Sequence, residues 1–365
     1  MKTEKDYLSF NKLRAKNQSK LSEKNFLKST HLKNPVLTER KTLQLIAEKI
    51  KKSKNVLLIG HKGPDYDCVG SLAALYSVLK AEGKQVRVLS DFGTDTWVYF
   101  KNFHPNIAKK ITKDFKPDLA LMVDYGAQRI LEKGALGILR AKKPFVITID
   151  HHQKSDQFGD VVLIDDTKHS NCELLLDVFQ KMKVYLKEEA RIALLAGMWS
   201  DTGGFSHYFL TPEILSKIKK LVISGTEFTR AMQIIKTWHR LKDFVFYAKN
   251  LSQLKIDENT GLGYVIIKGP LHGNQSFTSM VANTVCYVRG IEVVVVMRNI
   301  GKGVFRASLR SANSSVGVVD VSKIANYFGG GGHLNAAAFQ IKMNSAKIIR
   351  KVKELIREQQ LEHGK

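Results

Sequence analysis

The chain contains 365 residues, 44% of them hydrophobic, and carries a formal net charge of +24. This length favours two domains, and the composition is that of a globular protein. No apolar run approaches the roughly 20 residues that a membrane-spanning helix requires, and the first 20 residues lack the apolar segment of a secretory signal. We therefore expect a cytoplasmic protein without a membrane-bound part.

The positive charge favours a polyanionic partner, of which nucleic acid is the commonest. A lysine-rich organism explains the charge equally well, so the charge alone does not select a substrate. The cysteines are Cys68, Cys172 and Cys286, an odd number without a CxxC pair. They are expected to be reduced thiols rather than disulfides or zinc ligands, and only Cys68 stands near a predicted strand end.

The first half of the chain alternates strands with helices. Strands are predicted over 55–59, 85–89, 118–123 and 144–149, one helix opens at Gly70–Ser71 and ends at Gly83, and another covers 188–199. Short, continuously apolar strands separated by helices indicate a parallel sheet that is covered on both faces. In such sheets, ligands bind beyond the carboxyl ends of the strands.

The second half indicates a smaller, mixed α/β domain. Helical periodicity covers 214–221 and 229–251, and strands are predicted over 261–267 and 336–341. Residues 292–298 and 304–310 flank Asn299–Gly303 and predict a hairpin. A short helix over 320–328 ends in four glycines, and the final helix, from 346 to about 362, is basic and amphipathic.

Acidic residues and histidines gather where strands or helices end. They are His61, Asp65, Asp67, Asp124, Asp150, His151, His152 and Asp201. Such groups cost free energy beside a buried sheet unless something charged compensates them. Carboxylates mixed with imidazoles suit Mn²⁺ or Mg²⁺, with Fe²⁺ and Zn²⁺ as alternatives. Their number fits two divalent ions about 4 Å apart, which together can activate a water and neutralise a phosphoryl transition state.

This set of motifs resembles the DHH–DHHA1 phosphoesterases, and within them the NrnA-type oligoribonucleases that also dephosphorylate adenosine 3′,5′-bisphosphate (PAP). The resemblance covers about residues 40–345. It rests on His61, Pro64–Asp65–Tyr66–Asp67, Gly70–Ser71, Asp150–His151–His152, Ser308–Leu309–Arg310–Ser311, Gly329–Gly330–Gly331–Gly332–His333 and Ala336–Ala337. Gly63, Tyr66, Cys68 and Ala338 depart from the family pattern. These departures affect the expected substrate preference and leave every ligand position filled.

The resemblance implies a role for each matching residue. One metal ion would be held by His61, Asp65 and Asp124, and a second by Asp67, Asp124, His151 and Asp201, with Asp124 bridging. Asp150 would orient an imidazole, and His152 would contact the scissile phosphate. Arg310, Gly330, Gly331, Gly332 and His333 would bind the far phosphate or terminal nucleotide. Consecutive glycines independently favour this, because their amides can approach an anion closely.

The resemblance also implies a domain order and a function. The expected order is a basic extension over 1–35, a DHH catalytic domain over 36–225, a helical linker over 226–255, a DHHA1 substrate domain over 256–345 and a basic helix over 346–365. The expected activity is the hydrolysis of very short RNA to 5′-mononucleotides with two divalent ions, Mn²⁺ first, and of PAP to AMP. The expected partner is a short RNA or a dinucleotide. Whether the chain forms a homodimer stays open.

Three alternatives remain open. The first is a phosphodiesterase for cyclic di-AMP or linear pApA, and the second is a RecJ-like single-strand exonuclease, for which no extra nucleic-acid-binding domain is visible. The third is a non-catalytic RNA-binding protein, which predicts a lost ligand, whereas every ligand position is filled. A family II pyrophosphatase is disfavoured by the glycine-rich segment before His333.

Overall fold

The structure is a computed structural model that describes residues 39–90, 115–126, 134–152, 155, 157–205, 211–236, 241–269, 277–312 and 319–362. The chain forms two compact units, the first built from most residues up to Ile235 and the second from Lys236 onward. The predicted basic extension over 1–35 lies outside the described residues. In the described parts of the chain, no helix has the length and apolar character to cross a bilayer.

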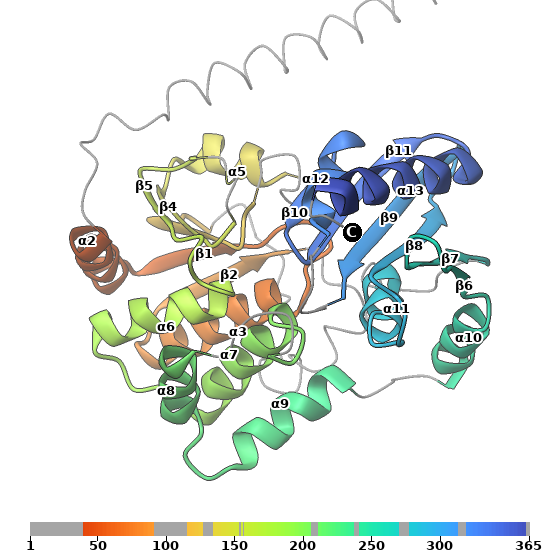
Figure 1. Ribbon diagram of the computed structural model, residues 1–365. Coiled ribbons are helices and arrows are strands. Elements are labelled where there is room, and N and C mark those ends of the chain that lie inside the picture. Colours follow the sequence, from red (N-terminus) through yellow and green to blue (C-terminus); the bar gives the residue numbers. More distant parts are fainter. Residues whose placement is uncertain are drawn as a thin grey trace, which may run out of the picture. The chain divides into compact units, whose positions relative to one another are not determined.

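Unit 1 is built on a five-stranded parallel sheet with strand order β2-β1-β3-β4-β5 (Figure 1). The strands are β1 (Asn55–Ile59), β2 (Gln85–Leu89), β3 (Leu119–Val123), β4 (Phe145–Asp150) and β5 (Val161–Ile164). The helices are α2 (Glu39–Lys52), α3 (Tyr66–Ala81), α5 (Ala135–Lys142), α6 (Asn171–Met182), α7 (Glu188–Asp201), α8 (Pro212–Leu221) and α9 (Thr226–Lys236). The central strands β1, β3 and β4 are almost completely buried, as the continuous apolar runs predict.

Helices cover both faces of this sheet. Helix α5 packs through Ala135 and Leu139 on one face, and α3, α6 and α7 lie on the other (Figure 1). Helices α3 and α7 approach closely because two glycines leave room. A Cβ on Gly70 would lie 2.5 Å from the Ala193 carbonyl oxygen, and one on Gly197 would lie 2.9 Å from Asp67 Oδ1. This close contact brings the start of α3 against α7, which later carries Asp201.

Unit 2 is a six-stranded mixed sheet with strand order β10-β11-β9-β8-β7-β6. Its strands are β6 (Lys255–Asp257), β7 (Leu262–Ile267), β8 (Val293–Asn299), β9 (Val304–Ser311), β10 (Gly331–His333) and β11 (Ala336–Lys342). Its helices are α10 (Leu241–Leu251), α11 (Phe277–Val285), α12 (Val321–Tyr327) and α13 (Ser345–Glu362). Only β7 and β8 are parallel neighbours, and β8 and β9 form the predicted hairpin.

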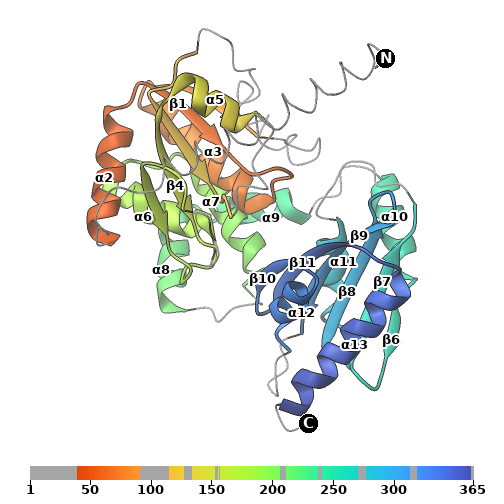
Figure 2. The same ribbon diagram turned by 90° about the horizontal axis from the view of Figure 1, so that it is seen from above.

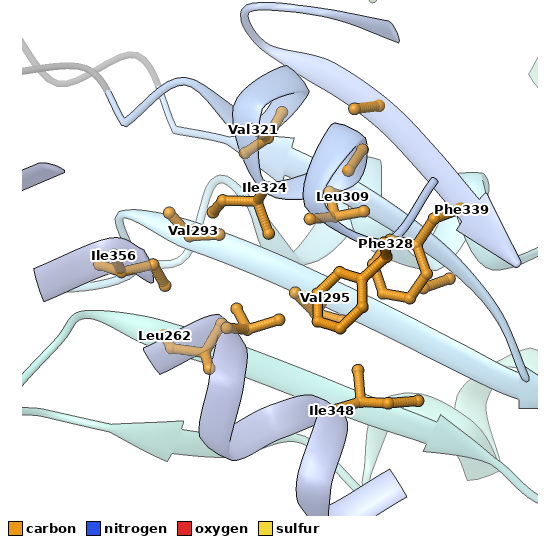
Figure 3. Close-up of a cluster of buried hydrophobic side chains, with 14 of the residues drawn as sticks. Leu262, Val293, Val295, Leu309, Val321, Ile324, Phe328, Phe339, Ile348 and Ile356 are labelled. Atoms are coloured by element: carbon orange, nitrogen blue, oxygen red, sulfur yellow. The ribbon is translucent and has the colours of Figure 1, made fainter. Parts of the chain in front are cut away.

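The sheet of unit 2 is covered on both faces (Figure 2). Helices α12 and α13 bury one face through a cluster that includes Val295, Leu309, Phe328 and Ile348 (Figure 3). Helix α11 covers the other face, where Val281 packs among side chains of β7 and β8. Both predicted domain types, a parallel α/β domain and a smaller mixed one, are therefore confirmed.

Two details differ from the expected elements. The periodicity over 229–251 predicted one helix, whereas the structure has α9 and α10 on either side of 237–240, which lie outside the described residues. No element was predicted over α2, α5, β6, α11 or β10, and none over β5 and α6. Both turn out to matter for the site, because β5 extends the sheet beyond β4 and α6 contacts Asp67. The predicted domain boundaries stay predictions.

Candidate metal centre

The predicted residues of unit 1 lie at one edge of the parallel sheet. His61 follows β1, Asp124 follows β3, and Asp150 ends β4 and is followed by His151 and His152. Because these strands are parallel, their carboxyl ends meet at that edge. Helix α3 adds Asp67 and α7 ends at Asp201. The distances between their atoms show which of these side chains lie close together.

Asp124 occupies the middle of the cluster. Its Oδ2 lies 3.4 Å from His61 Nε2, and its Oδ1 lies 3.6 Å from His151 Nε2. The side chain is 1% exposed, and Oδ1 has no hydrogen-bond partner within the described part of the chain. The backbone of Asp124 is left-handed, with φ of 51°, a conformation that costs a non-glycine residue free energy. Oδ2 therefore faces His61, whereas Oδ1 faces His151 and His152.

A second group joins Asp67, His151 and Asp201. His151 Nε2 lies 3.6 Å from Asp67 Oδ2 and 3.3 Å from Asp201 Oδ2. The first turn of α6 fixes Asp67, because Asn171 N donates to Oδ2 at 2.6 Å and Cys172 N donates to Oδ1 at 2.9 Å. The sequence analysis did not find this anchor, although Ser170 and Glu173 form the Ser-x-x-Glu pattern that marks a helix start.

Burial and mutual repulsion perturb the carboxyl groups. Burial, with the charges of Asp201 and Asp124, raises the pKa of Asp67 well above its usual range. Burial, with the charges of Asp65 and Asp124, raises the pKa of Asp201 to about 6. Burial opposes ionisation of Asp124 too, but its contacts with His151 and His61 outweigh burial and lower its pKa. A divalent cation would relieve this crowding, so the nitrogen and oxygen donors fit a metal ion.

Asp150 and His152 form a hydrogen-bonded pair that adjoins Asp124, because His152 Nδ1 also lies 3.4 Å from Asp124 Oδ1. Asp150 Oδ1 accepts a hydrogen bond from His152 Nδ1 at 2.8 Å and the amide hydrogen of His151 at 2.9 Å. Its Oδ2 accepts the amide hydrogen of Gly126 at 2.8 Å. Asp150 is completely buried, whereas the His152 side chain is 38% exposed. Burial lowers the pKa of His152, but the hydrogen bond to Asp150 and the charge of Asp124 outweigh burial and raise it.

Asp65, a predicted ligand of the ion beside His61, also has a structural role, and Cys68 lies where no ligand was predicted. Asp65 caps α3, because its Oδ1 accepts the amide hydrogens of Asp67 and Cys68 at 3.1 Å. This oxygen lies 3.9 Å from His61 Nε2, and the side chain is 47% exposed. Cys68 instead falls in the same candidate ligand group as His61 and Asp124. The sequence signal for Cys68 as a ligand was its position, three residues after Asp65 in the same turn.

Two of the five predicted substrate residues of unit 2, Arg310 and Gly331, lie on one sheet face. Arg310 pairs with Ala336 across β9 and β11, and Gly331 pairs with Ala338, so all four lie on the α11 face. Asn283 of α11 orients the guanidinium by accepting from Nε at 2.6 Å. The side chain of His333 lies outside the described residues.

The four glycines have unequal structural roles. A Cβ on Gly330 would lie 2.2 Å from the Ala338 carbonyl oxygen, and one on Gly332 would lie 2.4 Å from that of Ala336. The Gly330 amide also donates to the Ala325 carbonyl at the end of α12. A Cβ on Gly331 would have Asn326 Oδ1 as its nearest neighbour, at 3.9 Å. Gly330 and Gly332 are therefore required for packing, and Gly331 is the one of these three without a steric reason.

The fold and the clustered acids and histidines define a metal-dependent phosphoesterase. The DHH family N-terminal domain model matches residues 55–198, and the DHHA1 domain model matches residues 263–358. The chain therefore belongs to the DHH–DHHA1 family.

The chain is similar to several named proteins. It is 26% identical over 325 residues to the bifunctional oligoribonuclease and PAP phosphatase NrnA of Thermus thermophilus, an alignment that covers 87% of this chain and 94% of that protein. It is also 26% identical to the cyclic-di-AMP phosphodiesterase GdpP of Geobacillus thermodenitrificans, over 81% of this chain but 46% of that protein. An exopolyphosphatase-related protein from Bacteroides fragilis shares the fold, with a TM-score of 0.72 at 19% identity over 89% of this chain and 99% of that chain.

Proposed function

We propose that the protein binds two divalent cations and hydrolyses very short RNA to 5′-mononucleotides. Mn²⁺ would occupy at least the site formed by Asp67, His151 and Asp201. Dephosphorylation of PAP to AMP would be a second activity of the same site. We place both in the cytoplasm. The observation that supports the metal centre most directly is the double orientation of Asp124, whose two oxygens face His61 and His151 separately. A carboxylate in that position can bridge two ions.

The residues around Asp124 divide the work. His61 would hold one ion, and Asp67, His151 and Asp201 the other, with Asp124 shared. Held by these residues, two such ions would supply an activated water and neutralise charge on a transferring phosphoryl group. Asp65 stabilises the turn that carries Asp67, since its carboxylate caps α3. Helix α6 holds Asp67 in place through two amides, which fixes that ligand before any ion binds.

His152 would act on the leaving group. Asp150 binds its Nδ1, which fixes the ring and favours the protonated form. With 38% of the side chain exposed, the ring can meet a substrate. A protonated imidazole there would donate a proton to the leaving oxygen, a contribution typically worth about 10²- to 10⁴-fold in rate. Asp150 would be a positioning residue, because it is completely buried and holds the ring of His152 and the backbone around it.

In unit 2, Arg310 and the Gly331 amide would bind a substrate phosphate. Arg310 and the Cα of Gly331 lie on the same sheet face, and Asn283 holds the guanidinium in a fixed orientation. An arginine and a backbone amide are a common pair of phosphate-binding groups.

The substrate class is supported by coverage. The NrnA relative is matched over 94% of its length, whereas the chain matches only 46% of the cyclic-di-AMP phosphodiesterase. We therefore favour short RNA and PAP. Hydrolysis of cyclic di-AMP or pApA is the second candidate. Over the aligned residues, the chain has the same sequence identity to that phosphodiesterase as to the NrnA relative.

One parallel assay tests this function. The full-length protein with Mn²⁺ is offered a 5-mer RNA, PAP, pApA and cyclic di-AMP at equal concentrations. We expect the 5-mer to be degraded fastest, PAP to be dephosphorylated, and Asp124→Asn to abolish both activities. Asp118→Asn is the matched control, because Asp118 stands at the opposite end of β3 and its carboxylate accepts hydrogen bonds from the Lys54 and Asn55 amides, away from the cluster. Preferential cleavage of cyclic di-AMP, or an active Asp124→Asn variant, would refute the proposal.

A further inference from the structure

Cys68 brings a sulfur atom to the cluster. The thiol Sγ, an imidazole nitrogen of His61 and a carboxylate oxygen of Asp124 all lie within 4.8 Å of one another. The three residues come from different elements, since His61 follows β1, Cys68 lies in α3 and Asp124 follows β3. Cys68 is completely buried, and Asp124 is 1% exposed. A buried thiol that faces both an imidazole and a carboxylate has more than an apolar packing role.

The position of the sulfur is fixed by its surroundings. The Cys68 amide donates to Asp65 Oδ1 at 3.1 Å, which holds the backbone at the helix start. On the other side, a Cβ added to Gly60 would lie 2.8 Å from Sγ, so the sulfur fills the space that a side chain at position 60 would need. The donor is therefore placed before an ion binds, as a metal site requires.

The donor type determines which ion the site prefers. Thiolate ligands favour Zn²⁺ and Fe²⁺, whereas carboxylate and carbonyl oxygens suit Mn²⁺ and Mg²⁺. A coordinating thiol loses its proton to the cation. The set around His61 offers nitrogen, sulfur and oxygen, while Asp67, His151 and Asp201 offer nitrogen and oxygen alone. The two sites therefore differ in softness.

We propose that Cys68 is a ligand of the ion held by His61 and Asp124, and that this site takes a thiophilic divalent ion, Zn²⁺ or Fe²⁺, while the other site takes Mn²⁺. This inference rests on the proposed metal centre and changes its composition. The protein would then be a mixed-metal enzyme, and manganese alone would fill only one of its sites well.

Cobalt substitution tests the sulfur ligand directly. The full-length protein is stripped of metal and reconstituted with Co²⁺, and bound ions are counted by elemental analysis. We expect two ions per chain and a near-ultraviolet thiolate-to-cobalt charge-transfer band. Cys68→Ser should lose the band, whereas Cys172→Ser and Cys286→Ser, which change the other two buried free cysteines, should keep it. Two bound ions without the band would overturn the inference alone, and no bound ions would overturn the metal centre as well.

Two further measurements test the sulfur ligand, and the first uses the wild-type protein alone. X-ray absorption at the zinc edge of the zinc-loaded wild-type protein should show one sulfur neighbour at about 2.3 Å. In competition experiments, Cys68→Ala should reduce the preference for Zn²⁺ over Mn²⁺ by at least about tenfold, the lower end of what loss of even an outer-sphere partner costs. A zinc shell made only of nitrogen and oxygen, or an unchanged preference, would contradict the role of Cys68.

Discussion

Asp150 Oδ1 lies 2.8 Å from His152 Nδ1, and the same oxygen accepts the backbone amide of His151. One buried carboxylate thus orients the exposed histidine and the strand end that carries the buried one. This arrangement separates two tasks within the Asp-His-His triplet. His151 faces Asp67, Asp124 and Asp201, whereas His152 is directed by Asp150 and is the more exposed ring.

Asp150→Asn should weaken catalysis through His152. An amide cannot stabilise the imidazolium as a carboxylate does, so we expect a rate loss of about 100-fold or more. Since the Asp150 contact raises the pKa of His152, the alkaline limb of the rate profile should move to lower pH in the variant. Steady-state kinetics across pH, with the metal content of both proteins measured, checks this. An unshifted alkaline limb with full metal content would contradict the positioning role.

Asp124→Asn should abolish stabilisation by metal ions. Asparagine tolerates the left-handed backbone at this position, so the variant should fold. A ligand that binds only the folded state raises the midpoint of thermal unfolding. Adding Mn²⁺ should therefore raise the midpoint of the wild type and of Asp118→Asn, and leave Asp124→Asn unchanged. Differential scanning calorimetry with and without a chelator provides the measurement, and an equal rise in all three proteins would count against a site at Asp124.

Two neighbouring glycines should respond differently to alanine. Gly330→Ala forces a Cβ to within 2.2 Å of the Ala338 carbonyl and should destabilise unit 2 by roughly 1–3 kcal/mol. Gly331→Ala meets nothing closer than 3.9 Å, and its methyl group lies on the same sheet face as Arg310. We expect normal stability and a raised KM. Denaturant unfolding and kinetics separate the two effects, and an unchanged KM for Gly331→Ala would remove the glycine amide from the phosphate site.

Glu227 should make the stability of unit 1 depend on acid pH. Its carboxylate accepts a hydrogen bond from Arg191 Nη2 at 2.7 Å, which lowers its pKa from 4.5 to about 2. A depressed folded-state pKa stabilises the fold fully above pH 4.5, and this stability is lost as the pH falls toward 2. Glu227→Gln should therefore be less stable at pH 7, and its difference from the wild type should shrink over that range.

The matched control for that variant is Glu213→Gln. Glu213 also pairs with lysines, but its side chain is 62% exposed, and exposed ion pairs contribute little to stability. Urea unfolding at several pH values compares the two. If both variants lost equal stability at pH 7, burial of the Arg191–Glu227 pair would not be the cause.

The sequence predicted those parts of the site that follow from strand order. His61, Asp124 and Asp150 each stand at the end of an apolar run, and parallel strands place such ends together. The amino-acid sequence of each run was sufficient to predict that these strand ends meet. The hairpin around Asn299–Gly303 was also predicted, because turn residues separate two strand-forming runs.

Contacts between distant elements could not be predicted in this way. The anchoring of Asp67 depends on α6, which lies about 100 residues further along the chain. The sulfur of Cys68 reaches Asp124 only because Gly60 leaves space beside it. The glycines before His333 were interpreted as an anion-binding run, whereas Gly330 and Gly332 also have a steric reason that only the packing of β10 on β11 reveals.

The central claim is that Asp124 joins two metal ions, and anomalous diffraction tests it most directly. Crystals of the full-length protein soaked in Mn²⁺ and Zn²⁺ would be measured at the manganese and zinc edges. We expect two peaks about 4 Å apart on either side of the Asp124 carboxylate, one beside His61 and one beside His151. A map without peaks at Asp124, from crystals that contain manganese elsewhere, would contradict the account.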